Sequence, residues 1–323
     1  MTEHRTLKGT DLTVSRACFG TMTFGSQVDE ALAASMVNYC IERGINFFDT
    51  ANMYQVGVSE QLLGKALRGK RERVVLASKV RGKMGEAADQ NGLSRAAIMR
   101  AVEESLQRLQ TDYLDIYYLH QPDYDVSLEE SLETMQELVK AGKVRYPASS
   151  NYASWQVGQM LCLAEKQDYQ SATIAQQMYN LVARGLEQEF VPMARELSVS
   201  IIAYNPLAGG LLTGKHHSDS ITPGTRFDKN SMYQDRYWHE QNFHAVERLQ
   251  AVAQQSGRSL ISLSLNWLMH HTVADCVILG ASKLEQLKEN LTVLDEGPLP
   301  SEVVELCDEV WNDLRGLTPL YNR

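Results

Sequence analysis

The chain has 323 residues, of which 44% are hydrophobic, and this length allows one large domain or two small ones. Its net charge of −9 argues against nucleic acid or an anionic membrane as the main partner. No apolar stretch is long enough to span a bilayer, and the polar N-terminus MTEHRTLKGTDLTVS lacks the pattern of a secretion signal, so we expect a soluble, cytoplasmic protein.

Strand-like and helix-like segments alternate along the chain after a hairpin that we expect at residues 6–15, around a Gly-centred turn. The expected strands are short apolar runs at 16–20, 45–48, 73–78, 113–119, 144–149, 173–177, 199–204 and 276–279. The expected helices have apolar residues every three or four positions and cover 29–43, 59–67, 94–109, 127–141, 154–165, 187–196, 244–255, 260–269, 283–293 and 301–314. Residues 208–238 form a long connection rich in Gly, His, Ser and Asp.

This alternation predicts the fold class. Continuous apolar strands between amphipathic helices indicate a parallel sheet covered by helices. Eight strands favour a single (β/α)8 TIM barrel over residues 1–323, with an N-terminal β-hairpin, a long loop after strand seven and an extra C-terminal helix. No GxGxxG follows an early strand, which argues against an open dinucleotide-binding sheet. The segments SLEE at 127–130 and SKLE at 282–285 predict capping boxes.

Four polar residues follow consecutive expected strands. Asp49, Lys79 and His120 come at the C-terminal ends of strands two, three and four, and Tyr54 lies in the loop after strand two. In a closed parallel barrel these strand ends share one rim, where active sites lie. Each residue alone has a simpler explanation, such as a turn, a cap or a solvent-facing side chain. Together they predict a catalytic site.

Together these four residues would form a general acid in which the pKa of the tyrosine is lowered towards neutral pH. A free tyrosine has a pKa of about 10, and a neighbouring ammonium lowers it by stabilising the phenolate. Lys79 would supply the ammonium, and Asp49 would supply the counter-charge that a buried lysine needs. Protonation of an oxygen by such an acid suits carbonyl reduction, with His120 orienting the substrate. No Ser or Cys stands in an elbow motif, so acyl transfer has little support.

Eight sequence blocks, in the same order along nearly the whole chain, resemble those of the aldo-keto reductases. They are GTMTFG (20–25), DTANMYQVGVSEQLLGKAL (49–67), SK (78–79), LHQPD (119–123), SNYASW (150–155), QQMYN (176–180), YNPLAGGLLTGK (204–215) and VILGASKLEQLKEN (277–290). The middle and C-terminal blocks are most similar to the aflatoxin-aldehyde reductase branch. The N-terminal third is similar to the branch with the potassium-channel β subunits.

The resemblance implies transfer of hydride from a bound nicotinamide cofactor to a carbonyl carbon, which reduces aldehydes and ketones to alcohols. Tyr54 would be the general acid, Lys79 and Asp49 would tune it, and His120 would orient the substrate. The resemblance also implies a cofactor site without a Rossmann fold. Its residues would be Gly20, Thr21, Met22, Asp49, Tyr54, Ser150, Asn151, Gln176, Tyr204, Asn205, Pro206, Leu207, Gly209, Gly210, Lys215, Arg226, Gly280, Ser282, Gln286, Glu289 and Asn290.

The adenosine end of this site also follows from general features of barrels. A phosphate site after strands seven and eight, at the N-terminus of an extra helix, is a recurrent feature. Ser282 and the free N–H groups of the first helical turn suit an anion, and Lys283 adds charge. This favours NADPH as the cofactor, although the lack of an arginine here leaves NADH possible. The simpler interpretation is that Ser282 only caps the helix.

The substrate is less well specified. By position, Met22, Met53 and the loop at 81–92 border the substrate pocket, and the long connection at 208–238 resembles a lid over the cofactor. The C-terminal Arg323 is similar to a terminal arginine that meets substrate carboxylate in the aflatoxin-aldehyde branch. It implies carboxylate-bearing aldehydes, and sugar-derived aldehydes are a further possibility. The simpler interpretation of Arg323 is a frayed terminus.

Two other classes of function stay open. The first is a cofactor-binding regulatory subunit of the channel β type, although such a sensor would not need His120. The second is a metal-dependent barrel hydrolase or isomerase, for which the sequence lacks a convincing cluster of His and Asp ligands. The five cysteines contain no CxxC pair, which argues against disulfides and a cysteine metal site.

Overall fold

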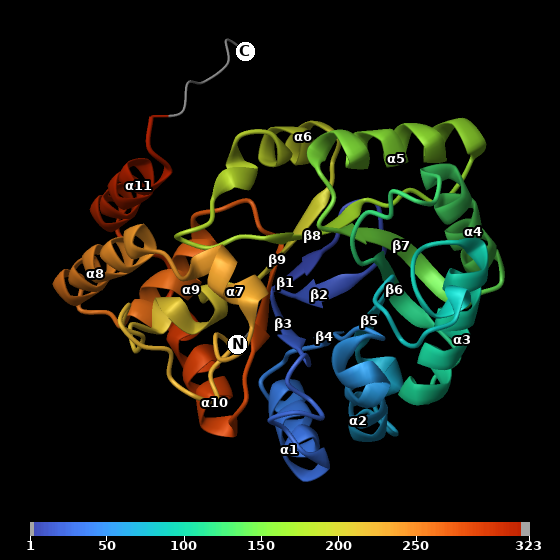
Figure 1. Cartoon of the computed structure of the whole chain (residues 1–323), viewed down its shortest axis with the longest axis horizontal. Coiled ribbons are helices and arrows are strands. Elements are labelled where there is room, and N and C mark those ends of the chain that lie inside the picture. The colour runs from blue at the N-terminus through green and yellow to red at the C-terminus, as the bar shows by residue number, and fades with distance from the viewer. Residues whose placement is uncertain (1–2, 318–323) are drawn as a thin grey trace. The chain divides into compact units, whose positions relative to one another are not determined.

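The protein is described by a computed structural model that covers residues 3–317 (Figure 1). These residues fall into two compact units. The first contains the chain up to Gln177, Glu187–Tyr204 and Ala274–Lys288; the second contains Met178–Leu186, Asn205–Val273 and the chain from Glu289 onward. The prediction that residues 1–323 form one domain stays a prediction.

A closed barrel of eight parallel strands forms the centre of the first unit (Figure 1). The strands follow one another around the barrel in chain order, and the last pairs with the first. They are β3 (Ala17–Gly20), β4 (Phe47–Asp49), β5 (Val75–Val80), β6 (Leu114–Leu119), β7 (Val144–Ser150), β8 (Ile174–Met178), β9 (Ser200–Tyr204) and β10 (Cys276–Gly280). The predicted TIM barrel is therefore confirmed.

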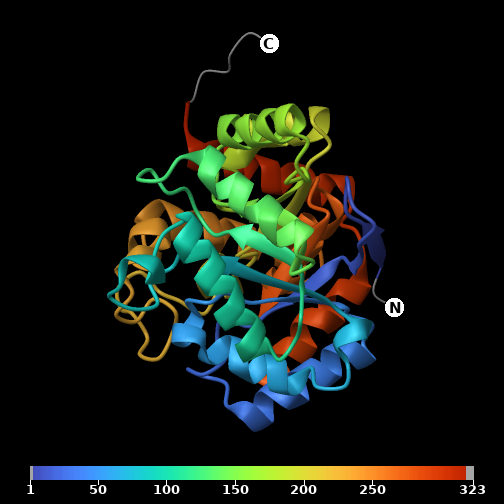
Figure 2. The same cartoon turned by 90° about the vertical axis from the view of Figure 1, so that its right-hand side faces the viewer.

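The helices of the first unit lie outside the strands. In the views of Figures 1 and 2 they follow one another around the barrel, and each packs on the next. They are α1 (Glu30–Glu42), α2 (Val58–Ala66), α3 (Arg95–Leu109), α4 (Leu128–Lys140), α5 (Ser154–Gln167) and α6 (Phe190–Glu196). Helices α2 and α3 approach so closely that a Cβ on Gly64 would lie 2.6 Å from the backbone of Leu109, so only glycine fits at this position.

The predicted capping boxes form only in part. The Ser127 hydroxyl accepts from the N–H of Glu130, as a capping residue should, but the Glu130 carboxylate accepts from the N–H of Arg95 instead of turning back. At the start of α10 (Leu284–Val293), the side chain of Gln286, and not that of Glu285 as predicted, accepts from the N–H of Ser282. The helix begins one residue later than predicted, at Leu284.

Inward-facing residues of the strands fill the barrel. Phe47, Ala77, Ile116 and Tyr118 belong to one buried cluster, as alternation along each strand requires. The predicted hairpin is confirmed as β1 (His4–Thr6) and β2 (Thr13–Ser15), which pair antiparallel. Its flanking apolar residues join the same core; they are Leu7, Leu12 and Val14.

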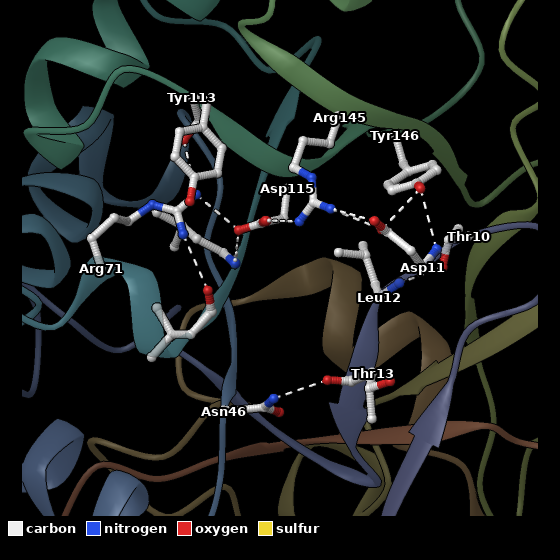
Figure 3. A network of polar contacts seen from close by, with 12 residues as sticks. Thr10, Asp11, Leu12, Thr13, Asn46, Arg71, Tyr113, Asp115, Arg145 and Tyr146 are labelled. Atoms are coloured by element: carbon white, nitrogen blue, oxygen red, sulfur yellow. Dashed lines mark hydrogen bonds and ion pairs between the residues drawn. The ribbon is translucent and has the colours of Figure 1, made fainter.

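A polar network around Asp115 ties the hairpin turn to the barrel (Figure 3). One carboxylate oxygen of Asp115 on β6 accepts from the N–H of Leu76 at 2.9 Å and forms an ion pair with Arg71 at 2.8 Å. The other accepts from Arg145 at 3.0 Å. Arg145 also donates to both carboxylate oxygens of Asp11 in the hairpin, at 2.8 and 2.9 Å. The carboxylate of Asp115 is almost fully buried, so its two arginine partners compensate a charge that water does not reach.

We expect Asp115→Ala to lower the free energy of unfolding by about 3 kcal/mol, because it leaves the largely buried Arg71 without its carboxylate. This loss of stability is at the low end of the range for a broken buried ion pair. The second partner of Asp115, Arg145, is more than one-third exposed and keeps its ion pair with Asp11. Urea unfolding measures the loss. Arg95→Gln breaks an exposed pair with Glu137 and should leave the stability unchanged; equal losses in the two variants would contradict the prediction.

The second unit is mainly helical. It contains a 3-10 helix at Ala208–Thr213, α7 (Ser231–Tyr237), α8 (Glu240–Gln255), α9 (Leu260–His270) and α11 (Ser301–Arg315). The long connection predicted at 208–238 thus contains two short helices, and α8 starts before the predicted residue 244. The extra C-terminal helix is confirmed as α11. Within residues 3–317, no helix is both long enough and apolar enough to cross a membrane.

An aromatic cluster holds the segment after the 3-10 helix. The rings of Phe227 and Trp238 lie 4.9 Å apart between centroids, and His216 lies 5.0 Å from Phe227. Tyr233 and Phe243 extend the cluster on either side. This packing explains why the segment has a defined path although its sequence is rich in loop-forming residues.

Candidate active site

The strand alternation places Asp49 and Lys79 inside the barrel. Phe47 and Asp49 are two residues apart on β4, Ala77 and Lys79 are two residues apart on β5, and Phe47 and Ala77 both face the core. Asp49 and Lys79 are therefore inward-facing at the C-terminal ends of neighbouring strands. Their relative exposures are 2% and 0%.

The two residues form a buried ion pair. The Lys79 Nζ donates to Oδ1 of Asp49 and to the carbonyl oxygen of Thr50, the latter at 2.8 Å. The second oxygen of Asp49 accepts from Nε2 of Gln176 on β8 at 2.9 Å. Burial lowers the pKa of Lys79, but the charges of Asp49 and Tyr54 and hydrogen bonds to both raise it more, so the pKa lies above the usual 10.5. Lys79 is therefore a cation at neutral pH.

Tyr54 stands directly over this pair. It opens a short 3-10 segment, Tyr54–Gly57, in which Gln55 and Val56 adopt left-handed φ values of 48° and 50°. The Lys79 Nζ lies 5.1 Å from the centroid of the Tyr54 ring. A hydrogen bond with Tyr54 is among the causes of the raised pKa of Lys79. The phenol thus meets a fixed positive charge.

His120 completes the group. It follows β6, and its N–H donates to the carbonyl oxygen of Val80 at 2.9 Å. Its ring lies 6.0 Å from the Tyr54 ring between centroids, edge to face. Burial, followed by the charges of Lys79 and Arg81, lowers the pKa of His120 to about 3, so the imidazole is neutral at working pH. Its Nδ1 is buried and has no hydrogen-bond partner among residues 3–317.

The next three strand ends carry a second connected group. The Tyr204 hydroxyl at the end of β9 donates to Oδ1 of Asn151 at 2.6 Å. Nδ2 of Asn151 donates to the carbonyl oxygen of His120 at 2.9 Å and to the Ser150 hydroxyl at 3.1 Å. Asn151 has a φ of 63°, a value that asparagine tolerates better than most residues. With Gln176 bound to Asp49, both groups lie on one rim of the barrel.

The sequence pattern of the aldo/keto reductase family matches residues 16–312, a range that includes both groups. The chain belongs to the aldo/keto reductase family. This membership confirms the predicted resemblance, and it makes the chain an oxidoreductase whose general reaction is the reduction of aldehydes or ketones. The roles of individual residues in that reaction stay predictions.

Three relatives illustrate the similarity of this aldo/keto reductase to both predicted branches. Aflatoxin B1 aldehyde reductase member 2 of Rattus norvegicus is 38% identical over 322 residues, which cover 94% of this chain and 86% of the relative. The uncharacterized oxidoreductase YrpG of Bacillus subtilis is 34% identical over 328 residues, 98% of each chain. A probable voltage-gated potassium channel subunit beta of Oryza sativa subsp. japonica is 31% identical over 316 residues, 95% of this chain and 96% of the relative.

The loops after β3 and β10 carry further predicted cofactor residues of this aldo/keto reductase. Gly20 and Gly280 are paired where the first and last strands close the barrel, with Thr21 and Met22 just beyond Gly20. A Cβ on Gly20 would lie 2.6 Å from Cγ2 of Ile278, so a larger residue does not fit there. The Thr23 hydroxyl donates to the carbonyl oxygen of Ala281 at 2.7 Å and joins the two loops.

Ser282 and Gln286 contact each other at the start of α10. The N–H and the hydroxyl of Ser282 both donate to Oε1 of Gln286 at 3.1 Å. In both contacts Ser282 is the donor, whereas a capping side chain accepts from a helix N–H. The role of Ser282 in a cofactor site stays a prediction. Lys283 is exposed beside it, so the local charge that favours an anion is also present.

The remaining predicted cofactor residues belong to the second unit, where several share a tight turn. Asn205 has a φ of 62°; it accepts from the N–H of Gly209 at 2.7 Å and donates to the Tyr237 hydroxyl at 2.9 Å. Arg226 donates to the Tyr233 hydroxyl at 3.1 Å. A Cβ on Gly209 would lie 2.8 Å from the Tyr233 ring. That these residues serve one cofactor site, with Pro206, Leu207, Gly210, Lys215, Glu289 and Asn290, stays a prediction.

Of the predicted substrate residues, Met22 and Met53 are 37% and 44% exposed beyond the ends of β3 and β4. Arg323 lies outside the described residues. Sequence reasoning missed Tyr118, whose buried ring lies 5.7 Å from the Lys79 Nζ on the side of the barrel core. Its position two residues before His120, on the inward face of an expected strand, was a signal that could have identified it.

Proposed function

We propose that this chain reduces aldehydes and ketones to alcohols with NADPH, and that Tyr54 is the general acid. The observation that carries the proposal is the placement of the Tyr54 phenol against a buried Lys79–Asp49 ion pair. A phenol beside a permanent cation gives up its proton more easily than one in water, because the cation stabilises the phenolate. Carbonyl reduction needs such a donor at the oxygen.

The residues divide the work of the reaction. Bound nicotinamide supplies the hydride that the carbonyl carbon accepts. Tyr54 gives its hydroxyl proton to the carbonyl oxygen, and Lys79 holds the resulting phenolate. His120 is neutral, since its pKa is about 3, and it can fix the same oxygen by a hydrogen bond without competing as an acid. Asp49 keeps Lys79 charged and in place.

The polar group at the ends of β7, β8 and β9 suits the carboxamide of a nicotinamide. A carboxamide needs both donors and acceptors, and Ser150, Asn151 and Gln176 offer hydroxyl and amide groups of both kinds. Tyr204 would stack on the ring, with its hydroxyl held by Asn151. For the remainder of the cofactor, the proposal rests on the similarity of sequence, and the charge of Lys283 at the start of α10 favours NADPH over NADH.

We expect wild-type protein to bind NADPH about tenfold or more tightly than NADH, because a 2′-phosphate gains charge-assisted hydrogen bonds. It should also oxidise NADPH in the presence of 4-nitrobenzaldehyde. Quenching of protein fluorescence measures the affinities, and absorbance of the reduced nicotinamide measures turnover. Equal affinities would remove the phosphate part of the proposal and leave NADH as a full alternative.

A second candidate is a cofactor-binding regulatory subunit with little turnover. It is favoured by the 31% identity to a relative named as a probable voltage-gated potassium channel subunit beta. The same experiment separates the two functions, since a regulatory subunit binds NADPH but oxidises it with no member of an aldehyde panel. We favour the enzyme because a sensor has no need for a neutral, buried imidazole beside the phenol.

We propose further that the protein works in the cytoplasm. Small carbonyl compounds are its substrates, and neither nucleic acid nor a membrane is its partner, as the net charge of −9 suggests. A cytoplasmic location agrees with the five cysteines of the sequence, which are odd in number and contain no CxxC pair.

A further inference from the structure

Arg81 lies two residues beyond Lys79, directly after the last residue of β5. Its φ is 125°, a value that residues other than glycine rarely adopt. Its carbonyl oxygen accepts from the N–H of Gly92 at 3.1 Å, which closes the loop between these two residues. A strained backbone is retained where neighbouring structure fixes it, and such positions are concentrated at functional sites.

The guanidinium of Arg81 has no ion pair or hydrogen bond with any of residues 3–317, and its Nε is buried. Arg100, which lines the same hollow, is by contrast held by Asp89 at 2.9 Å and by Glu104 at 2.8 Å. Partly buried cations are normally paired, since removing them from water is costly. Arg81 therefore has donor capacity that the described part of the chain does not use.

The charge of Arg81 acts on the proposed active site. It is one of the causes that lower the pKa of His120, after burial and the charge of Lys79. It also opposes the rise in the pKa of Tyr152, a residue that follows β7 by two positions. Arg81 directly follows Val80, whose carbonyl oxygen accepts from the N–H of His120 at 2.9 Å, so Arg81 lies close to the rim on which Tyr54 and His120 meet.

We propose that Arg81 recognises an anionic oxygen group, a carboxylate or a phosphate monoester, on the carbonyl substrate. The inference rests on the proposed carbonyl reduction and assigns to Arg81 the recognition of anionic aldehydes, which the sequence connected only with Arg323. The planar guanidinium presents parallel N–H donors that match the two oxygens of such a group. A substrate held in this way has its anionic end beside β5 and its carbonyl group beside His120, so compact acidic aldehydes fit best.

A simpler role for Arg81 is structural. Asn52, which is 1% exposed, lines the same hollow and also has a buried acceptor, Oδ1, without a partner among the described residues. One water between the Asn52 Oδ1 and the Arg81 Nε would satisfy both atoms with no part in substrate recognition. The two roles differ in one measurable respect, because a structural role affects charged and neutral substrates alike.

The test compares matched aldehydes on wild-type protein, Arg81→Gln and Arg81→Lys. One pair is 4-carboxybenzaldehyde and 4-nitrobenzaldehyde, and the other is glyceraldehyde 3-phosphate and glyceraldehyde. We expect Arg81→Gln to lower the ratio of kcat/KM for the anionic over the neutral partner by about 10- to 100-fold, mainly through KM, and Arg81→Lys to retain part of it. The pair that shows the larger change identifies the carboxylate or the phosphate as the preferred group.

Arg95→Gln is the matched control, because it removes the same charge from an exposed position on α3 and should leave both ratios unchanged. An unchanged ratio in Arg81→Gln, or an equal fall for both partners, overturns the proposal. If wild-type protein turns over no aldehyde, the proposed reaction fails, and calorimetric titration with 4-carboxybenzaldehyde in the presence of NADPH decides on Arg81. Equal affinities of wild-type protein and Arg81→Gln would then overturn its role in anion binding.

Discussion

Tyr54→Phe is expected to lower kcat/KM for every accepted aldehyde by about 10²- to 10⁴-fold, the usual contribution of a positioned proton donor. Phenylalanine keeps the ring that lies 5.1 Å from the Lys79 Nζ and removes only the hydroxyl. The protein should therefore fold normally and bind NADPH with little change. NADPH oxidation with 4-nitrobenzaldehyde measures the loss, and circular dichroism with a fluorescence titration checks folding and binding.

Tyr124→Phe is the matched control for this loss. Tyr124 lies in the loop after β6 and is 82% exposed, so removal of its hydroxyl should leave the turnover rate unchanged. A Tyr54→Phe protein that stays folded and keeps full activity on all aldehydes would show that another group protonates the oxygen. The mechanism would then lose its central step.

The barrel was predictable because its strands are buried on both sides. A strand buried in this way appears in the sequence as a continuous apolar run, and eight such runs between amphipathic helices have few other solutions. A charged residue inside a buried strand interrupts the apolar run, and the end of the strand is then predicted wrongly. The third strand was expected to end at Ser78, but β5 continues to Val80 and includes Lys79. The burial of Lys79 depends on its ion pair with Asp49, the last residue of β4, and the sequence of β5 alone does not show this partner.

Pro147 shows how register resolves an apparent conflict. A proline cannot donate to a strand ladder, so its position in an expected strand was awkward. In the structure Pro147 lies opposite Tyr117 of β6, and the pairing of β7 with β8 involves Ser149 and Ser150 beyond it. The residue thus lies outside the second ladder, where its missing N–H has no partner to lose. The register in which a strand pairs with its two neighbours cannot be derived from the sequence of that strand alone.

The convergence of Asp49, Lys79 and His120 could be predicted from a rule of topology, since the C-terminal ends of parallel barrel strands share one rim. Residues whose importance is recognised from the partners of their side chains could not be predicted in this way. Arg81 is notable for the partners that it lacks, and Tyr118 for the ammonium near its ring. Both features need distances between residues that are far apart in the sequence.

The second large effect concerns the buried ion pair. We expect Asp49→Asn to lower the free energy of unfolding by about 3–5 kcal/mol, because it leaves the fully buried ammonium of Lys79 without a counter-charge. Replacing both partners, as in Asp49→Asn with Lys79→Met, removes the charge as well and should recover most of this loss. Neither protein should reduce aldehydes at the wild-type rate. Urea unfolding of the two single variants, the double variant and wild-type protein provides the full cycle.

The dependence on pH gives this cycle an independent check. The folded protein holds the Lys79 proton more tightly than the unfolded chain does, because the pKa of Lys79 is raised above its usual 10.5. The stabilisation from the pair is therefore complete below about pH 10.5, and it is lost as the pH rises through the folded-state pKa. The difference in unfolding free energy between wild-type protein and Asp49→Asn should shrink over the same range. A difference that stays constant to high pH would mean that the lost stability comes from the hydrogen bonds of Asp49 and not from the charge of Lys79.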